Sequence, residues 1–223
     1  MITPRLHAIL SKISTPTLAD IGTDHAYIPI RLVQMGKIES AIATDINPGP
    51  IKIAKRNIEK YGLSDRICVR LGGGLTPLHK GEVETILIAG MGGELISSII
   101  RKDLDKAHSA RRLILQPMNA QYELRKMLEK NGFRIIEEDL ALEGFKVYNL
   151  MTVETGHSQA HEEIFYHLPK SLQSHPYFPH LKAKKRREFT KILKGLTRAK
   201  MKDTEQIEKY RTLLDELEQL QEE

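Results

Sequence analysis

The sequence predicts an α/β fold in which a doubly wound, mostly parallel sheet is followed by an α-helical hairpin. From residue 17 to residue 154, short apolar runs alternate with stretches of helical spacing, which is the pattern of repeated β-α units. The last two apolar runs are separated only by residues 143–146, as in a β-hairpin. Beyond this point helical spacing takes over. These observations predict a first domain of residues 1–154 and a second domain of residues 155–223.

The strands of the first domain are expected to be short apolar runs that helices cover on both faces. They are expected at residues 17–21, 40–45, 67–71, 85–89, 112–116, 133–142 and 147–153. Helices are expected between them, at residues 28–35, 49–61, 94–100 and 120–130. A parallel sheet that ends in a β-hairpin is typical of the Rossmann-like class I methyltransferase arrangement and separates it from dinucleotide-binding dehydrogenases.

The second domain is predicted to be an antiparallel coiled-coil hairpin of two α-helices. The apolar residues of both helices follow a 3-4-3 spacing, and they are Phe189, Ile192, Leu196, Ala199, Tyr210, Leu213, Leu217 and Leu220. Asp203 and Gln206 interrupt the spacing where a continuous coiled coil would be apolar. Residues 203–206 resemble a capping box that starts a second helix, so the turn is expected near residues 201–204.

Charge is concentrated in this hairpin. The chain carries a net charge of +5, and residues 182–202 hold ten basic residues against one acid, whereas residues 203–223 hold eight acids against two basic residues. Such an excess favours a polyanionic partner, and the candidate RNA-phosphate contacts are Arg186, Arg187 and Lys191. The alternative is a solvated basic helix that its acidic neighbour partly neutralises.

Composition excludes several other classes of protein. No run approaches the ~20 apolar residues of a membrane helix, and the N-terminus lacks a secretory signal, so a cytoplasmic location is expected. The single cysteine, Cys68, rules out an internal disulfide framework and a cysteine-based metal cluster. Because Cys68 lies in an expected strand, we expect a buried core thiol. No metal site is implied.

Glycines or acidic residues stand at the carboxyl ends of four successive expected strands, where open α/β sheets bind ligands. Asp20 and Gly22 fit an acid-x-Gly-x-Gly-x-Gly pattern, in which Asp24 and Ala26 replace the later glycines. Asp45 suits the hydroxyls of an adenosine ribose, although it could instead cap the following helix. A nucleotide-like ligand is therefore expected. The expected cofactor contacts are Asp20, Gly22, Thr23, Asp45, Ile46, Gly72, Gly73, Gly74, Ala89 and Gly90.

The chain resembles the bacterial tRNA (adenine-22-N1)-methyltransferases, the TrmK family. The matching segments are residues 19–29, 45–50, 70–75, 88–93 and 115–117, which include the specific stretches DHAYIP and IAGMGG. The sequence departs from the family pattern at Met118, which intervenes before Asn119, and at Gly73, where the family often has Asn or Asp. The resemblance implies S-adenosylmethionine as methyl donor and N1 of a tRNA adenine as acceptor.

N1 of adenine already carries a lone pair, so the reaction needs positioning and stabilisation of a cationic product. Because N1 lies on the pairing edge, the base must be unpaired or flipped. We expect Asp24 to stabilise charge or accept a proton and His25 to orient the base. Asp24 could instead cap the next helix or contact the cofactor. Tyr27 either stacks on a base or is a core aromatic.

The remaining expected substrate contacts come from two other strand ends. The loop after residue 89 has no side-chain acceptor for an exocyclic amine, which suits a ring nitrogen, although it could be only a glycine-rich helix entry. The contacts expected here are Met91, Gly92, Gln116 and Pro117. The competing functions are methylation of another RNA and RNA binding by a degenerate, non-catalytic methyltransferase fold.

Overall fold

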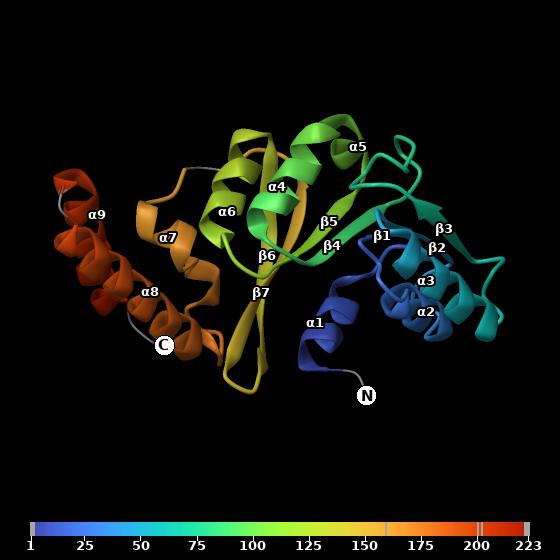
Figure 1. The fold of residues 1–223 in the computed structure, drawn as a ribbon, viewed down its shortest axis with the longest axis horizontal. Helices are drawn as coiled ribbons and strands as arrows, with labels where there is room; N and C mark the ends of the chain where they lie inside the picture. The colour runs from blue at the N-terminus through green and yellow to red at the C-terminus, as the bar shows by residue number, and fades with distance from the viewer. Residues whose placement is uncertain (1–2, 159, 200, 202, 221–223) are drawn as a thin grey trace.

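A computed structural model describes residues 3–158, 160–199, 201 and 203–220. The described chain contains a seven-stranded sheet in the order β3-β2-β1-β4-β5-β7-β6, and β7 runs antiparallel to both of its neighbours (Figure 1). The strands are β1 (Thr17–Ile21), β2 (Ser40–Asp45), β3 (Ile67–Leu71), β4 (Thr85–Met91), β5 (Arg112–Pro117), β6 (Phe133–Glu143) and β7 (Lys146–Thr155). The predicted parallel sheet with a terminal hairpin is confirmed.

Helices cover both faces of this sheet. The helices are α1 (Pro4–Lys12), α2 (Tyr27–Gln34), α3 (Pro48–Lys60), α4 (Gly93–Lys102), α5 (Leu104–Ser109), α6 (Gln121–Lys130), α7 (Glu163–His167), the 3-10 turn η1 (Lys170–Leu172), α8 (Phe178–Arg198) and α9 (Thr204–Gln219). One core contains buried residues of α1, α2 and α3, and the other contains those of α4, α5 and α6. Strand residues alternate between the two cores: Leu113 and Leu115 face one, and Ile114 faces the other.

Helix α1 was not expected from the sequence analysis. Thr3 caps it, because the side-chain oxygen of Thr3 accepts the backbone N–H of Leu6 at 3.3 Å, and Pro4 occupies its first turn. Ile9 and Leu10 are buried against the sheet. A Thr-Pro start followed by apolar residues at helical spacing is the sequence signal that identifies such a helix.

The edge position of β3 overturns the expectation of a buried Cys68. β3 pairs only with β2 at the end of the described sheet, and Cys68 is exposed. A strand run alone does not distinguish a central strand from an edge strand, which lacks a neighbour on one side.

The C-terminal helices α8 and α9 lie side by side and antiparallel (Figure 1). Lys182, near the start of α8, donates to the carbonyl of Leu220 at 2.7 Å, beyond the end of α9. Asp203 caps α9 by accepting the backbone N–H of Gln206 at 3.0 Å, as expected. The predicted turn includes Lys202, and the basic segment includes Lys200 and Lys202, which lie outside the described residues.

A third core joins this hairpin to the sheet. It contains buried residues of α7, α8 and α9 together with Leu140 of β6 and Val147 of β7. The boundary after residue 154 stays a prediction. None of the described helices combines the length and apolar character needed to cross a bilayer.

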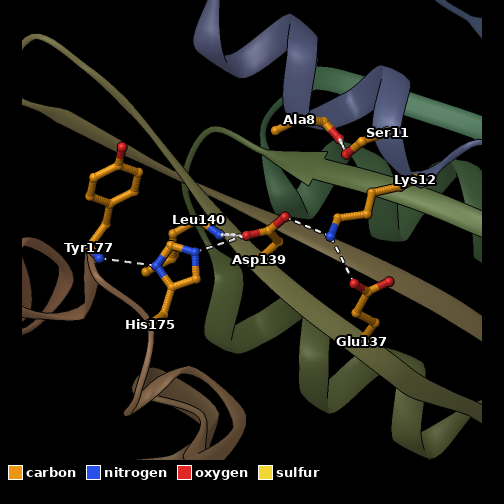
Figure 2. Close-up of polar contacts among 8 residues, drawn as sticks. All are labelled: Ala8, Ser11, Lys12, Glu137, Asp139, Leu140, His175 and Tyr177. Atoms are coloured by element: carbon orange, nitrogen blue, oxygen red, sulfur yellow. Dashed lines mark hydrogen bonds and ion pairs between the residues drawn. The ribbon is translucent and has the colours of Figure 1, made fainter. Parts of the chain in front are cut away.

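An ionic chain also links α1, β6 and the segment that leads into α8 (Figure 2). Lys12 Nζ lies 2.6 Å from Asp139 Oδ2 and 2.8 Å from Glu137 Oε1. His175 Nδ1 accepts the Tyr177 N–H at 3.0 Å, so Nε2 carries the proton donated to Asp139 Oδ1 at 2.9 Å. Burial alone would raise the pKa of Asp139, but the hydrogen bond and charge of Lys12 lower it. Lys12, His175 and the backbone N–H of Leu140 thus all favour the ionised carboxylate.

Candidate active site

The carboxyl ends of β1, β2, β3 and β4 surround a cavity of about 460 Å³. The strand ends and the loops that follow them form its wall on the sheet side, with Gly22, Asp45, Ile46, Asn47, Gly72, Gly73, Gly74, Ala89, Gly90 and Met91. Residues of α4 close the other side. This cavity, termed the first cavity below, brings together most of the expected cofactor contacts.

Asp45 is the acidic residue that the first cavity has at the strand ends, and Asp103 lines the opposite side. It ends β2, and its Oδ1 accepts the backbone N–H of Asn47 at 2.8 Å. The N-cap of α3 is Asn47, so the alternative in which Asp45 caps this helix is wrong. Within the described residues this is the only hydrogen bond to the Asp45 carboxylate. The carboxylate thus retains acceptor capacity for hydroxyl groups.

Glycines keep the first cavity open beside an exposed apolar side chain. A Cβ on Gly73 would lie 3.2 Å from Ile46 Cδ1, and Ile46 is 69% exposed. Gly74 has φ +57°, and a Cβ there would lie 3.1 Å from Ile99 Cγ2. Side chains at these positions would therefore fill space next to Ile46 or strain the turn.

A second cavity of about 510 Å³ adjoins the first and shares Gly22, Ala89 and Gly90 with it. Its wall carries the polar side chains of the DHAY stretch. Asp24 Oδ2 lies 3.3 Å from His25 Nε2, and the His25 ring stacks on Tyr27 with centroids 5.3 Å apart. Tyr27 is 59% exposed, so the alternative of a core aromatic is wrong.

The backbone before α2 is contorted at this point. Gly22, Asp24 and Ala26 have φ values of +73°, +53° and +58°. The non-glycine residues cost of order 1 kcal/mol each in this region, and such strain concentrates at functional sites. The N-cap of α2 is Ala26 and receives no side-chain hydrogen bond, so Asp24 does not cap the helix.

Asp20 and Thr23 support this turn. Asp20 is buried and lines neither cavity, and its Oδ2 accepts the hydroxyl of Thr23 at 2.6 Å. Burial raises the pKa of Asp20 to about 6, with a smaller opposite effect from the Thr23 hydrogen bond. Thr23 contributes to the wall of the second cavity. Asp20 therefore lies behind the expected cofactor contacts.

Gln116 and Pro117 are buried and line neither cavity. The Gln116 Oε1 atom accepts the backbone N–H of Gly90 and the Nη1–H of Arg5, each at 3.2 Å. Its Nε2 donates to the Pro117 carbonyl at 3.2 Å. Gln116 thus holds the loop of Gly90 and a cavity-lining arginine. Arg5 was missed by the sequence analysis because α1 was missed.

The last residue of β4 and the residue after it lie in different environments. Met91 lines the first cavity, whereas Gly92 lines neither. A Cβ on Gly92 would lie 2.9 Å from Asn119 Oδ1, so Gly92 allows the loops after β4 and β5 to approach. Within the described residues, no three His, Cys, Asp or Glu side chains gather as a metal-binding group.

The expected RNA contacts lie apart from both cavities, on α8. A surface groove of about 540 Å³ follows this helix and includes Arg186, Arg187 and Lys191, with Lys194 and Arg198 beyond them. Arg186 forms an ion pair with Glu218 of α9. The groove carries no acidic side chain among its described lining residues, so positive charge dominates its surface.

Comparisons with known proteins point to one family. A family model described as a methyltransferase domain matches residues 2–151. The chain is 43% identical over 143 residues to the tRNA (adenine(22)-N(1))-methyltransferase of Bacillus subtilis, and the alignment spans 64% of this chain and 60% of that protein. The solved B. subtilis M1A22 tRNA methyltransferase TrmK is 30% identical with a TM-score of 0.88, over 99% of this chain and 98% of that chain. A Streptococcus pneumoniae protein solved with S-adenosyl-L-methionine is 34% identical with a TM-score of 0.85, over 99% of both chains.

Proposed function

The chain belongs to the tRNA (adenine-22-N1)-methyltransferase family, and from that premise we propose that it transfers a methyl group from S-adenosylmethionine to N1 of adenine 22 in tRNA. The observation that carries the proposal is the junction of two cavities at Gly22, Ala89 and Gly90. One cavity has the groups that suit a nucleoside, and the other has those that suit a flipped base. In-line transfer requires a donor and an acceptor to meet at such a junction.

The residues of the first cavity fit S-adenosylmethionine. The free acceptor capacity of Asp45 suits the two ribose hydroxyls. Gly73 leaves room beside Ile46, whose exposed apolar side chain suits one face of an adenine ring. When bound, the cofactor supplies an electrophilic methyl group on a sulfonium. The reaction therefore needs no metal ion to create an electrophile.

The residues of the second cavity fit a flipped adenine. Tyr27 offers an exposed ring on which a base can stack. The Asp24 carboxylate stabilises the positive charge that the adenine gains as its N1 is methylated. His25 orients the base, and its ring is itself held between Asp24 and Tyr27. In this arrangement Asp24 and His25 are the catalytic residues.

The groove on α8 suits the phosphate backbone of tRNA. Arg187 and Lys191 are exposed on it, and Arg186 is partly neutralised by Glu218. Sequence-independent contacts of this kind position a folded RNA without reading its bases. We place the reaction in the cytoplasm, on free tRNA, with no stable protein partner required.

The test is methyl transfer from labelled S-adenosylmethionine to unmodified tRNA transcripts, followed by reverse transcription. Wild-type protein should cause a stop at adenine 22, because a methyl group on N1 blocks pairing, and a transcript with guanine at position 22 should remain unlabelled. Asp24→Ala should lower the rate by at least about a hundredfold while cofactor affinity is kept. Asp65→Ala, in an exposed loop outside both cavities, is the matched control. Labelling at another position would refute the assigned acceptor, and wild-type rates for Asp24→Ala would refute its role.

A further inference from the structure

Four arginines of the described chain are at least partly shielded from solvent: Arg5, Arg70, Arg112 and Arg125. Three of them are neutralised by glutamates, at 2.5 Å for Arg70, 3.3 Å for Arg112 and 2.7 Å for Arg125. Arg5 is the exception, because no carboxylate of the described residues forms an ion pair with its guanidinium. A shielded cation without a counter-ion is costly, so an anion is the group that Arg5 lacks.

The existing contacts of Arg5 hold it in place without a described carboxylate in ion-pair contact. Its Nη1 donates to the neutral amide of Gln116 at 3.2 Å, and its Cζ lies 5.4 Å from the centroid of the Tyr148 ring. The hydrogen bond from Arg5 to Glu143, at 3.0 Å, comes from the backbone N–H, and although the charge of Arg5 helps to lower the pKa of Glu143, the two side chains form no ion pair. The Nε atom of Arg5 is buried and has no hydrogen-bond partner.

The position of this guanidinium is at the junction of the two cavities. Arg5 lines the second cavity, and its Nη1 lies 3.7 Å from where a Cβ on Gly90 would be. Gly90 belongs to both cavities, and its backbone N–H shares the Gln116 oxygen with Arg5. One amide therefore fixes both the arginine and the backbone of the junction.

We propose that Arg5 binds an oxyanion of a substrate at this junction, and that Gln116 is the residue that positions it. The inference rests on the proposed function, because two oxyanions then come to the junction: the α-carboxylate of S-adenosylmethionine and the phosphodiester beside the flipped nucleotide. Both offer paired oxygens to the fork of N–H groups on a guanidinium. Arg5 binds whichever of them reaches its unpaired donors.

The first arm of the test measures binding of S-adenosylmethionine and of its decarboxylated analogue by calorimetry. If Arg5 binds the carboxylate, Arg5→Gln should weaken S-adenosylmethionine binding by about ten- to a hundredfold and leave the decarboxylated analogue unaffected. Gln116→Glu should act in the same direction, because it places a carboxylate against Arg5 and so occupies it. Melting curves and circular dichroism check that each variant folds.

The second arm measures tRNA binding as a function of salt. If Arg5 binds a phosphodiester, Arg5→Gln should lower the slope of log K against log salt by about 0.7–0.9 and leave the affinity for S-adenosylmethionine unchanged. Arg111→Gln is the matched control. Arg111 is exposed and directly precedes β5, so it lies at the amino ends of the strands, opposite the carboxyl ends that form the cavities.

An effect of Arg5→Gln in either arm identifies the anion. If this variant folds and changes neither the preference for the carboxylated cofactor nor the salt slope, the proposal is overturned. Neither arm requires methyl transfer, so these outcomes are separate from a failure of the proposed activity.

Discussion

Replacing Asp20 with Asn tests whether a buried carboxyl group beneath the site costs stability at neutral pH. Asp20 is 4% exposed and accepts one hydrogen bond, from the hydroxyl of Thr23 at 2.6 Å. Burial, reinforced by the negative charge of Asp45, raises the pKa of Asp20 to about 6 in the folded protein. Asn has nearly the same shape and keeps an oxygen that accepts the Thr23 hydroxyl, but it carries no charge.

The direction and size of the effect follow from proton linkage. The unfolded chain releases the Asp20 proton near pH 3.8, whereas the folded chain keeps it until about pH 6. Between these values the folded state binds more protons, so the free energy of unfolding falls as the pH rises. A difference of about two pH units corresponds to about 3 kcal/mol. Relative to the wild type, Asp20→Asn should therefore gain about 2–3 kcal/mol between pH 4 and pH 7.

Urea unfolding of both proteins from pH 4 to pH 7.5 measures this difference, because all other titrations cancel in the comparison. Asp65→Asn removes an exposed carboxylate and serves as the control for loss of a charge. A difference between wild type and Asp20→Asn that stays constant across this range would show that the carboxyl does not titrate as its burial requires.

Two further predictions concern the cofactor cavity and the RNA groove. Gly73→Ala should weaken S-adenosylmethionine binding by about tenfold or less, because the new Cβ pushes Ile46 into the first cavity. Calorimetry measures this affinity, and an unchanged value would contradict the placement of Gly73 and Ile46 in the cofactor cavity. Reversing the charge of Arg186 and Arg187 to Glu should lower tRNA affinity and flatten its salt dependence, whereas Arg211→Glu, on the acidic helix, should not.

The sheet could be predicted nearly residue by residue because its signals are local. β1, β2 and β3 have the predicted bounds, and the remaining strands extend at one or both ends. The central runs β1, β2, β4 and β5 are mostly buried on both faces, and a turn-forming or charged segment follows each of them. The prediction failed for Cys68 because burial of an edge strand depends on what lies beside it in space.

The residues that line the two cavities could also be anticipated in part. Asp24, His25 and Tyr27 lie together on the wall of one cavity, and Asp45 with the residues 72–74 lies on the wall of the other. What local sequence could not give is the contact of these groups with α1, which precedes β1 in the chain and packs against β6 and β7. Such contacts depend on tertiary packing, which no spacing records.

The alternation of side chains along β5 predicts which face of the sheet Gln116 lies on. Leu113 and Leu115 face the core of α4–α6, and Ile114 faces the core of α1–α3, so the next residue, Gln116, falls on the side of α1. A buried amide there must satisfy its polar atoms, and it does so with the backbone N–H of Gly90 and with Arg5. A polar residue at a central strand end therefore predicts a polar partner from the helix on its own face. The alternation therefore places Gln116 on the face that α1 covers, and the tertiary structure shows that the partner there is Arg5.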